Sequence, residues 1–154
     1  MTIHLGTDLV YIPRIQATLD RFGERFLQRV YTLSEQQDYK QRVSQPETGL
    51  GKTPRSRVLA RTDRAAIHYL AGRWAAKEAV AKALGTGFAG VRYTDIEIQR
   101  LDSGVPQVQL SPTLSAQIAV WGRCCWQLSL SHDRDYCIAV AIAVCTPFKE
   151  QTEP

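Results

Sequence analysis

The stretch YCIAVAIAVC, residues 136–145, constrains the fold more than any other part of the sequence. In a strand, alternate residues point to opposite faces. One face then carries the larger side chains, Tyr136, Ile138, Val140, Ile142 and Val144. The other face carries only small ones, Cys137, Ala139, Ala141, Ala143 and Cys145. Because both faces are apolar, we predict a central strand covered on both sides. The small-residue face would admit close packing, by another layer of the chain or by another subunit.

The rest of the sequence predicts an α+β fold, in which helices pack on a mainly antiparallel sheet. Apolar spacing gives the order strand, three helices, two strands, helix, two strands. The predicted strands cover 2–10, broken at Gly6-Thr7-Asp8, and 92–101, 106–110, 125–131 and 136–145. The predicted helices cover 12–30 with an interruption at Gly23, 32–43, 63–84 and 111–121. A capping box, Thr32 to Glu35, opens the second helix, and Gly85 follows the third.

The 154 residues fit a single domain, which we place at 1–146, followed by a polar tail at 147–154. The segment 44–62 is rich in Pro, Gly, Ser and Thr and predicts a mobile loop. It is also basic, with Lys52, Arg55, Arg57 and Arg61. No apolar run approaches the roughly 18 residues of a membrane span, and the first residues lack a signal-peptide pattern. We therefore expect a cytoplasmic protein that does not enter a membrane.

Four cysteines lie in the last two predicted strands, Cys124, Cys125, Cys137 and Cys145. Their spacing includes no C-x-x-C pair, so we do not expect a zinc site. The expectation is buried, reduced thiols, in keeping with a cytoplasmic location.

The net charge of +4 and the pI near 9.0 favour an acidic partner. Nucleic acid, a phosphorylated ligand and an acidic protein would all satisfy this balance. A nucleic-acid-binding module is disfavoured, because aromatic residues make up only 8% of the chain and are not interleaved with the basic ones. The sequence also lacks the spacing of helix-turn-helix, RNA-recognition and zinc-finger modules. We therefore expect no nucleic-acid partner.

The predicted helix RWAAKEAVAKALG, residues 73–85, distributes its charges unusually. At about 100° per residue, Arg73 and Lys77 fall among the large apolar residues. Glu78 and Lys82 adjoin a stripe of small residues, Ala71, Ala75 and Ala79. One interpretation is a surface ion pair of Glu78 with Lys82, worth about 0.2–0.5 kcal/mol. The other is a site for a multiply charged anion and Mg²⁺, in which Glu78 binds the metal and the lysines hold phosphates.

A magnesium site calls for a second carboxylate, and Asp8 offers one. It follows Gly6 at the end of a short apolar strand, where we expect the side chain to project at the rim of the sheet. The alternative for Asp8 is a turn or a helix cap.

Three blocks, in this order, resemble the 4′-phosphopantetheinyl transferase superfamily, and most closely its branch of holo-[acyl-carrier-protein] synthases. They are Gly6-Thr-Asp-Leu-Val10, the helix at 73–85, and Leu128-Ser-Leu-Ser-His132 followed by Tyr136-Cys-Ile-Ala-Val-Ala. Gly104-Val-Pro106 resembles a turn of that family as well. The match spans about residues 3 to 145, and it is the combination of blocks that makes it specific.

The resemblance implies the fold of that superfamily and a Mg²⁺-dependent reaction, with Mn²⁺ as an alternative metal. In this reaction 4′-phosphopantetheine passes from coenzyme A to a serine of apo acyl carrier protein, and adenosine 3′,5′-bisphosphate is released. The resemblance further implies a homotrimer with sites between subunits.

The resemblance also implies roles for individual residues. Asp8 and Glu78 match the metal-binding carboxylates, and Lys82 matches a lysine that contacts phosphates, so these three are the expected catalytic residues. The implied coenzyme-binding positions are Arg73, Lys77, Lys82, Gly85, Pro106 and His132. For His132 an ordinary role in a hairpin turn is the alternative. The proton acceptor for the serine remains open between Glu78 and a metal-bound water.

Acyl carrier proteins are acidic, and the first predicted helix carries arginines that suit them. Arg14 and Arg21 are seven residues apart and therefore lie on nearly one face. Arg14 is the position that matches a carrier contact in the family, and a solvated helix face is the alternative. The segment 44–62 is longer than the family usually carries, so no one of its basic residues can be aligned with the one that binds the 3′-phosphate. A non-catalytic relative is the rival interpretation, and the intact Asp8, Glu78 and Lys82 argue against it.

Overall fold

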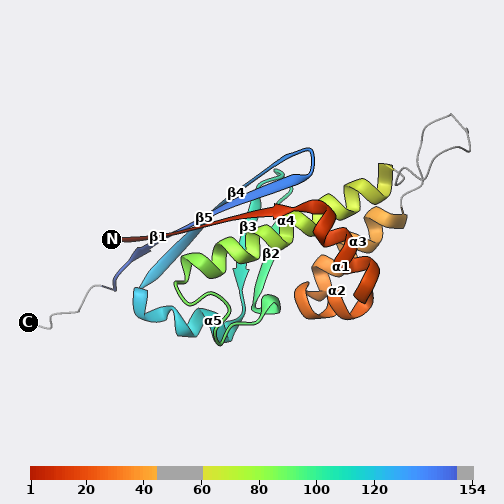
Figure 1. Cartoon of the computed structure of the whole chain (residues 1–154). Helices are drawn as coiled ribbons and strands as arrows, with labels where there is room; N and C mark the ends of the chain where they lie inside the picture. Colours follow the sequence, from red (N-terminus) through yellow and green to blue (C-terminus); the bar gives the residue numbers. More distant parts are fainter. Residues whose placement is uncertain (45–60, 149–154) are drawn as a thin grey trace, which may run out of the picture.

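The computed structural model describes residues 1–44 and 61–148 of the chain. Its main sheet has three antiparallel strands, β1 (Thr2–Tyr11), β4 (Arg123–Asp133) and β5 (Tyr136–Thr146), in the order β1-β5-β4. Residues 136–145 therefore lie in the central strand, β5, as predicted. The α+β class and the order of strands and helices are confirmed (Figure 1).

The two faces of β5 have different surroundings. Its small-residue face is fully buried and packs against the long helix α4 (Arg61–Ala83), whose alanines Ala71, Ala75 and Ala79 are also fully buried. Of the two alternatives for this face, packing by another layer of the same chain is the one observed. The predicted cover on both faces is found on this face alone in the single chain. The large-residue face is open in the single chain, where Tyr136 is 51% and Ile138 42% exposed.

Three shorter helices, α1 (Ile12–Phe22), α2 (Glu24–Val30) and α3 (Leu33–Ser44), gather beside the N-terminal half of α4 (Figure 1). Pro13 lies in the first turn of α1, where its missing N–H costs nothing. The predicted interruption at Gly23 separates α1 from α2, and its φ of 52° favours glycine. The predicted capping box opens α3, with Thr32 N donating to Glu35 Oε2 at 2.8 Å.

A second, two-stranded sheet follows α4 and a short 3₁₀ turn, η1 (Tyr93–Asp95). It pairs β2 (Ile96–Arg100) with β3 (Pro106–Leu110). Next come α5 (Pro112–Gln117), capped by the Ser111 hydroxyl that accepts from Leu114 N, and the turn η2 (Ala119–Trp121). The predicted loop 44–62 falls mostly on residues 45–60 and the predicted tail mostly on 149–154, both outside the described residues.

Strand β1 crosses α4 in close contact at Gly6. A Cβ added to Gly6 would lie 1.9 Å from Ala79 O and 2.5 Å from Ala83 N, so only glycine fits at this crossing. The predicted break at Gly6-Thr7-Asp8 does not occur, since β1 continues and Asp8 pairs with Ala139 in register. Asp8 is therefore part of the strand rather than at its end, and its side chain lies on the same face of β1 as Gly6, toward α4.

The expectation of buried, reduced thiols is correct for Cys137 and wrong for the other three cysteines. Cys124 and Cys145 are opposite one another in the β4–β5 register and form a disulfide. Cys125 is exposed, and Cys137 is a buried thiol whose pKa is raised to about 11, by burial first and by Asp8 second. None of the helices in the described ranges has the length and apolar character to cross a membrane.

Candidate active site

The site is built where β1 crosses α4, and Asp8 and Lys82 meet there. Lys82 Nζ lies 2.8 Å from Asp8 Oδ1 and also donates to Thr7 O at 2.9 Å. The close contact at Gly6 makes this pairing possible, because it brings the strand down onto the last turns of the helix. Lys82 is half exposed, whereas the Asp8 side chain is only 15% exposed. The predicted surface pair of Lys82 with Glu78 is replaced by this ion pair with Asp8.

Glu78 lies one helical turn before Lys82 and receives a hydrogen bond from outside the helix. The hydroxyl of Tyr93, in η1, donates to Glu78 Oε1 at 2.6 Å. Burial, then Glu78 and then Asp8 raise the pKa of Tyr93, while Arg14 acts in the opposite direction. Both carboxylates and Arg14 are thus close enough to act on one hydroxyl. The pairing of Asp8 with Glu78 as metal ligands stays a prediction, supported by their common effect on this hydroxyl.

Lys77 does not reach this group. Its side chain is fully buried, and Nζ lies 2.7 Å from Glu35 Oε2, 3.0 Å from Tyr93 O and 2.6 Å from Ile96 O. These three partners use the three donors of an ammonium group. Burial lowers the pKa of Lys77, and the Glu35 carboxylate opposes that effect. The interpretation of Lys77 as a phosphate-binding residue therefore does not agree with the structure, in which it joins α4 to α3, η1 and β2.

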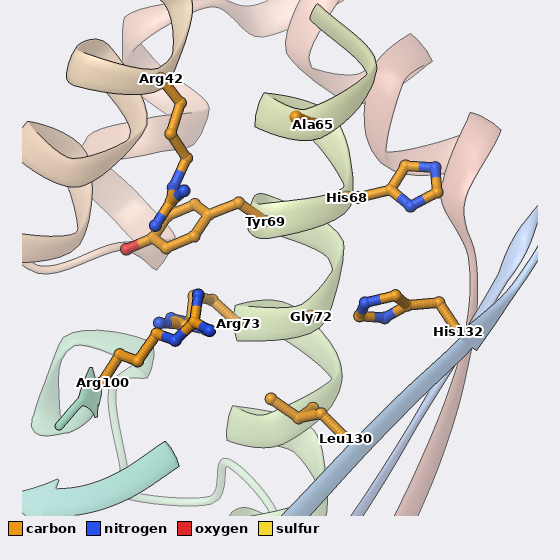
Figure 2. Close-up of a pocket in the computed structure, with 9 residues that line it drawn as sticks. All are labelled: Arg42, Ala65, His68, Tyr69, Gly72, Arg73, Arg100, Leu130 and His132. Atoms are coloured by element: carbon orange, nitrogen blue, oxygen red, sulfur yellow. The ribbon is translucent and has the colours of Figure 1, made fainter. Parts of the chain in front are cut away.

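Arg73 lies on a different side of α4, in a polar pocket of about 300 Å³. Arg73 is five positions before Glu78, which places the two side chains about 140° apart around the helix. Figure 2 shows Arg73 with Arg42 and Arg100 on one side of Gly72, and His68 with His132 on the other. The small residues Gly72 and Ala65 leave the space between them open.

The pocket is strongly cationic and incompletely hydrogen-bonded. The guanidinium carbons of Arg42 and Arg73 lie 4.5 Å and 4.4 Å from the centre of the Tyr69 ring. Within the described part of the chain, the buried Nε atoms of both arginines have no hydrogen-bond partner. Buried donors without a partner are rare, and a bound anion would satisfy them.

His132 and Pro106 are connected to this pocket, while Gly85 is not. His132 lies near the end of β4, and its ring centre is 5.8 Å from that of His68. Pro106 begins β3 opposite Arg100, which lines the pocket. Gly85 follows α4 with φ of 80°, so it ends the helix as predicted. In one chain, Arg73, Pro106 and His132 therefore line or adjoin this pocket, whereas Lys82 is paired with Asp8.

Arg14 and Arg21 are both exposed on α1. Beside them, a cavity of about 500 Å³ has an aromatic lining of Phe22, Phe26, Trp74 and Tyr93, with Arg25 and Arg29 at its border. Basic and apolar groups thus occur together next to the carboxylates of the site. This combination suits an acidic partner that also carries apolar side chains.

Several residues of the site were not anticipated from the sequence. Tyr93, Arg42, Arg100 and His68 belong to no motif, and each acquires its neighbours only through tertiary packing. The sequence held one usable signal, since Arg100 lies four residues before Gly104 of the predicted Gly104-Val-Pro106 turn, at the other end of the same strand connection as Pro106. Nothing in the local pattern around Tyr93 distinguishes it from a core tyrosine.

The chemistry of the carboxylate group suits a hard divalent cation shared with a ligand. Among the described residues, no three side chains of His, Cys, Asp or Glu form a group that could hold a metal on their own. Two carboxylates are nevertheless what Mg²⁺ needs when phosphate oxygens and water complete its coordination. Asp8, Glu78 and Lys82 together can hold a cation beside a phosphate.

Comparison with known proteins identifies the family of the chain. Residues 4–141 match the family model of the 4′-phosphopantetheinyl transferase superfamily. The holo-[acyl-carrier-protein] synthase of Gloeobacter violaceus is 46% identical over 140 residues, covering 91% of each chain. That of Protochlamydia amoebophila is 40% identical over 143 residues, covering 92% of this chain and 98% of the other.

Solved structures resemble the whole fold as well. The holo-[acyl-carrier-protein] synthase of Neisseria meningitidis matches with a TM-score of 0.72 and 32% identity, covering 92% of this chain and 97% of the other. The Helicobacter pylori enzyme in complex with coenzyme A matches with a TM-score of 0.67 and 27% identity, covering 91% and 99%. The chain therefore belongs to the 4′-phosphopantetheinyl transferase superfamily and is a transferase of that family.

Proposed function

We propose that the chain transfers 4′-phosphopantetheine from coenzyme A to a serine of apo acyl carrier protein and releases adenosine 3′,5′-bisphosphate. The observation that carries this proposal is the ion pair of Asp8 with Lys82 at the β1–α4 crossing, one helical turn from Glu78. Relatives that match over nearly the whole chain are named for this activity. One related structure contains coenzyme A.

The proposal includes a Mg²⁺ ion held by Asp8 and Glu78, with Mn²⁺ as an alternative. The donor chemistry fits, because both ligands are carboxylates and, within residues 1–44 and 61–148, neither belongs to a closed protein cage. When bound, the ion would supply positive charge to the diphosphate of coenzyme A.

Lys82 provides a second positive charge at the same place. Its ammonium is half exposed, and its flexible stem allows it to turn from Asp8 toward a phosphate oxygen. In the reaction, the serine oxygen bonds to the β-phosphorus of coenzyme A, while the bond from that phosphorus to the bridging oxygen breaks. Negative charge grows on the leaving bisphosphate, where a lysine stabilises it. The serine proton passes to Glu78 or to water in the site.

The pocket of Arg42, Arg73, Arg100 and His132 suits the nucleotide end of coenzyme A. Its unpartnered Nε atoms would donate to phosphate oxygens, and the guanidinium groups match phosphate geometry. The pocket surrounds Gly72, about 15 Å along α4 from Lys82, and its Arg73 lies about 140° around the helix from Glu78. His132 and Asp8 also come from strands at opposite edges of the main sheet. We therefore propose that each active site combines the carboxylates of one subunit with the cationic pocket of the next.

A homotrimer is part of this proposal, and the open face of the main sheet supports it. That face presents apolar side chains from β1 and β5, namely Ile3, Leu5, Leu9, Tyr136, Ile138, Val140, Ile142 and Val144. A contiguous apolar surface of this kind is typical of an oligomer interface. Light scattering should give three times the 17.3 kDa chain mass. Ile138→Glu, which places a charge on this face, should give the monomer mass.

Arg14 and Arg21 are proposed to contact the acidic carrier protein, with the neighbouring aromatic cavity receiving an apolar side chain of it. A cytoplasmic location is also proposed. The Cys124–Cys145 disulfide does not support that location, because such bonds are uncommon in the cytosol. Trapping the thiols with an alkylating agent at lysis would show whether this disulfide exists in the cell.

The reaction is tested directly by mixing the chain with apo acyl carrier protein, coenzyme A and Mg²⁺. Mass spectrometry of the carrier should show the gain of one phosphopantetheine, and chromatography should show adenosine 3′,5′-bisphosphate in equal amount. Transfer should cease in EDTA and resume when Mg²⁺ is restored. A carrier of unchanged mass, with a carrier protein known to accept the group from another transferase, would refute the proposal.

A further inference from the structure

We propose that Tyr93 is a positioning residue for Glu78. In this proposal the Tyr93 hydroxyl holds one oxygen of the Glu78 carboxylate and thereby presents the other oxygen to the divalent cation. The inference rests on the proposed function, because it takes Glu78 as a metal ligand.

The contact itself is short and charge-assisted. Tyr93 donates to Glu78 Oε1 at 2.6 Å, and both side chains are half-buried. Hydrogen bonds from a hydroxyl to a carboxylate at this distance are among the stronger ones in proteins. At neutral pH a tyrosine hydroxyl keeps its proton and remains a donor. The carboxylate therefore has one oxygen engaged, and its rotation about the last side-chain bond is restricted.

Tyr93 is in turn held by aromatic neighbours. Its ring stacks on Phe88, with ring centres 3.8 Å apart and planes 20° apart. Trp74, one turn before Glu78 on α4, lies on it with ring centres 5.1 Å apart. The ring therefore has little freedom to turn, and the direction of its hydroxyl is set by packing rather than by the hydrogen bond alone.

The backbone of Tyr93 is also held in place, by a hydrogen bond from Lys77. Its buried ammonium binds Tyr93 O, Ile96 O and Glu35, at 3.0, 2.6 and 2.7 Å. Asp95 closes the same turn by accepting from Arg92 N at 2.9 Å. Lys77 and Glu78 are neighbours on α4. The helix therefore binds the carbonyl oxygen of Tyr93 through Lys77 and accepts its hydroxyl hydrogen bond through Glu78.

This arrangement differs from that of Asp8, whose Oδ1 is paired with the half-exposed Lys82. Glu78 is fixed by a neutral donor on a rigid support, whereas Asp8 is paired with a cation that can leave. Partners that orient metal ligands in this way typically change metal affinity about 10–100-fold when they are removed. Tyr93 should thus affect metal binding more than it affects folding.

The variant Tyr93→Phe tests this, because it removes the hydroxyl and keeps the ring that packs on Phe88 and Trp74. The measurement is Mn²⁺ affinity of the full chain, by electron paramagnetic resonance of free Mn²⁺, with coenzyme A present at saturation. We expect about tenfold weaker Mn²⁺ binding in Tyr93→Phe. An affinity equal to that of the wild type would overturn the proposal.

Tyr31→Phe is the matched control for loss of a tyrosine hydroxyl. Tyr31 also donates one hydrogen bond, to Leu70 O at 3.1 Å, but in the core and not to a carboxylate. Tyr31→Phe should leave Mn²⁺ affinity unchanged even where it lowers the melting temperature. An equal loss of affinity in both variants would mean that general destabilisation, and not positioning, explains the result, and would refute the role of Tyr93.

Failure of the metal site itself would look different. In that case the wild type would bind no Mn²⁺ more tightly than Glu78→Gln does, and the proposed function would fall together with this inference. A second readout separates the positioning role further. Tyr93→Phe should raise the Mg²⁺ concentration required for half-maximal transfer about tenfold, while kcat at saturating Mg²⁺ and the KM for coenzyme A change much less.

Discussion

Lys77 and Glu35 form a buried ion pair, with Nζ 2.7 Å from Oε2 and both side chains at most 1% exposed. Glu35 also accepts from Thr32 N and Ile98 N, so it joins the start of α3 to β2. The pair therefore connects three elements around the turn that carries Tyr93. Lys77 of α4 thus stabilises the turn that carries Tyr93 from within the core, and it does not line the site.

Removal of the Lys77 ammonium should destabilise the fold rather than weaken coenzyme binding. Lys77→Met leaves the Glu35 carboxylate buried without its partner, which typically costs about 3–5 kcal/mol. Urea denaturation followed by tryptophan fluorescence measures this free energy of unfolding. Lys77→Met with unchanged stability and a raised KM for coenzyme A would restore Lys77 to the coenzyme site and contradict the structure.

The crossing of β1 and α4 should not tolerate a side chain at position 6. Gly6→Ala puts a Cβ against backbone atoms of Ala79 and Ala83 that cannot move aside, so we expect a loss of about 3 kcal/mol or more. Transfer activity should fall as well, because Asp8 moves with the strand.

Gly72→Ala is the matched control for this substitution. Gly72 is inside α4, and its added Cβ would have an ordinary contact with Cys137 Sγ at 3.9 Å. Alanine should therefore stabilise the helix by roughly 0.5–1 kcal/mol. Equal effects of the two alanine substitutions on the melting temperature would show that the crossing is not as tight as described.

His68 should make the fold sensitive to mild acid. Its pKa lies below 6.5, chiefly because of burial and then because of His132 and Arg64, with Asp135 opposing them. The unfolded chain therefore binds a proton that the folded chain does not, so stability falls as the pH drops through 6.5 toward the lower folded value. In His68→Gln the decrease in melting temperature between pH 7.5 and 5.5 should be smaller. Superimposable pH profiles of the two proteins would count against this.

Arg14 should serve the carrier protein and not the coenzyme. It is exposed on α1, yet near enough to Tyr93 to affect that hydroxyl. Arg14→Glu reverses a charge that faces an acidic partner, so the KM for apo carrier protein should rise about tenfold or more, equivalent to roughly 1.4 kcal/mol. The KM for coenzyme A is the internal control and should stay the same. Unchanged carrier kinetics would remove Arg14 from the docking surface.

Local patterns in the sequence were sufficient for most of the fold. The alternation at 136–145 predicts the central strand β5, and the alanine-rich run predicts most of α4, because both signals depend on residues close in sequence. The break assigned at Gly6 is wrong for a physical reason. Glycine there serves a close approach to α4, and a strand pattern alone does not distinguish such a glycine from a turn.

The site was predictable only where a motif carried it. Asp8, Glu78 and Lys82 were identified through a resemblance; the structure pairs Asp8 with Lys82 and places Glu78 one helical turn from that lysine. The positions of Lys77 and Arg73 could not be read from the helix, because their partners lie in α3, η1 and β2 or in the neighbouring pocket. The Cys124–Cys145 disulfide likewise depends on the β4–β5 register, which the separate strand patterns do not specify.

The central claim is that Asp8 and Glu78 act together on one coenzyme diphosphate. The most direct measurement is the rate at which apo acyl carrier protein gains phosphopantetheine, followed by mass spectrometry across a Mg²⁺ titration. Wild type should transfer the group, and Asp8→Asn and Glu78→Gln, each still folded, should be slower by at least about 100-fold at any Mg²⁺ concentration. Rates near that of the wild type in both variants would contradict the claim.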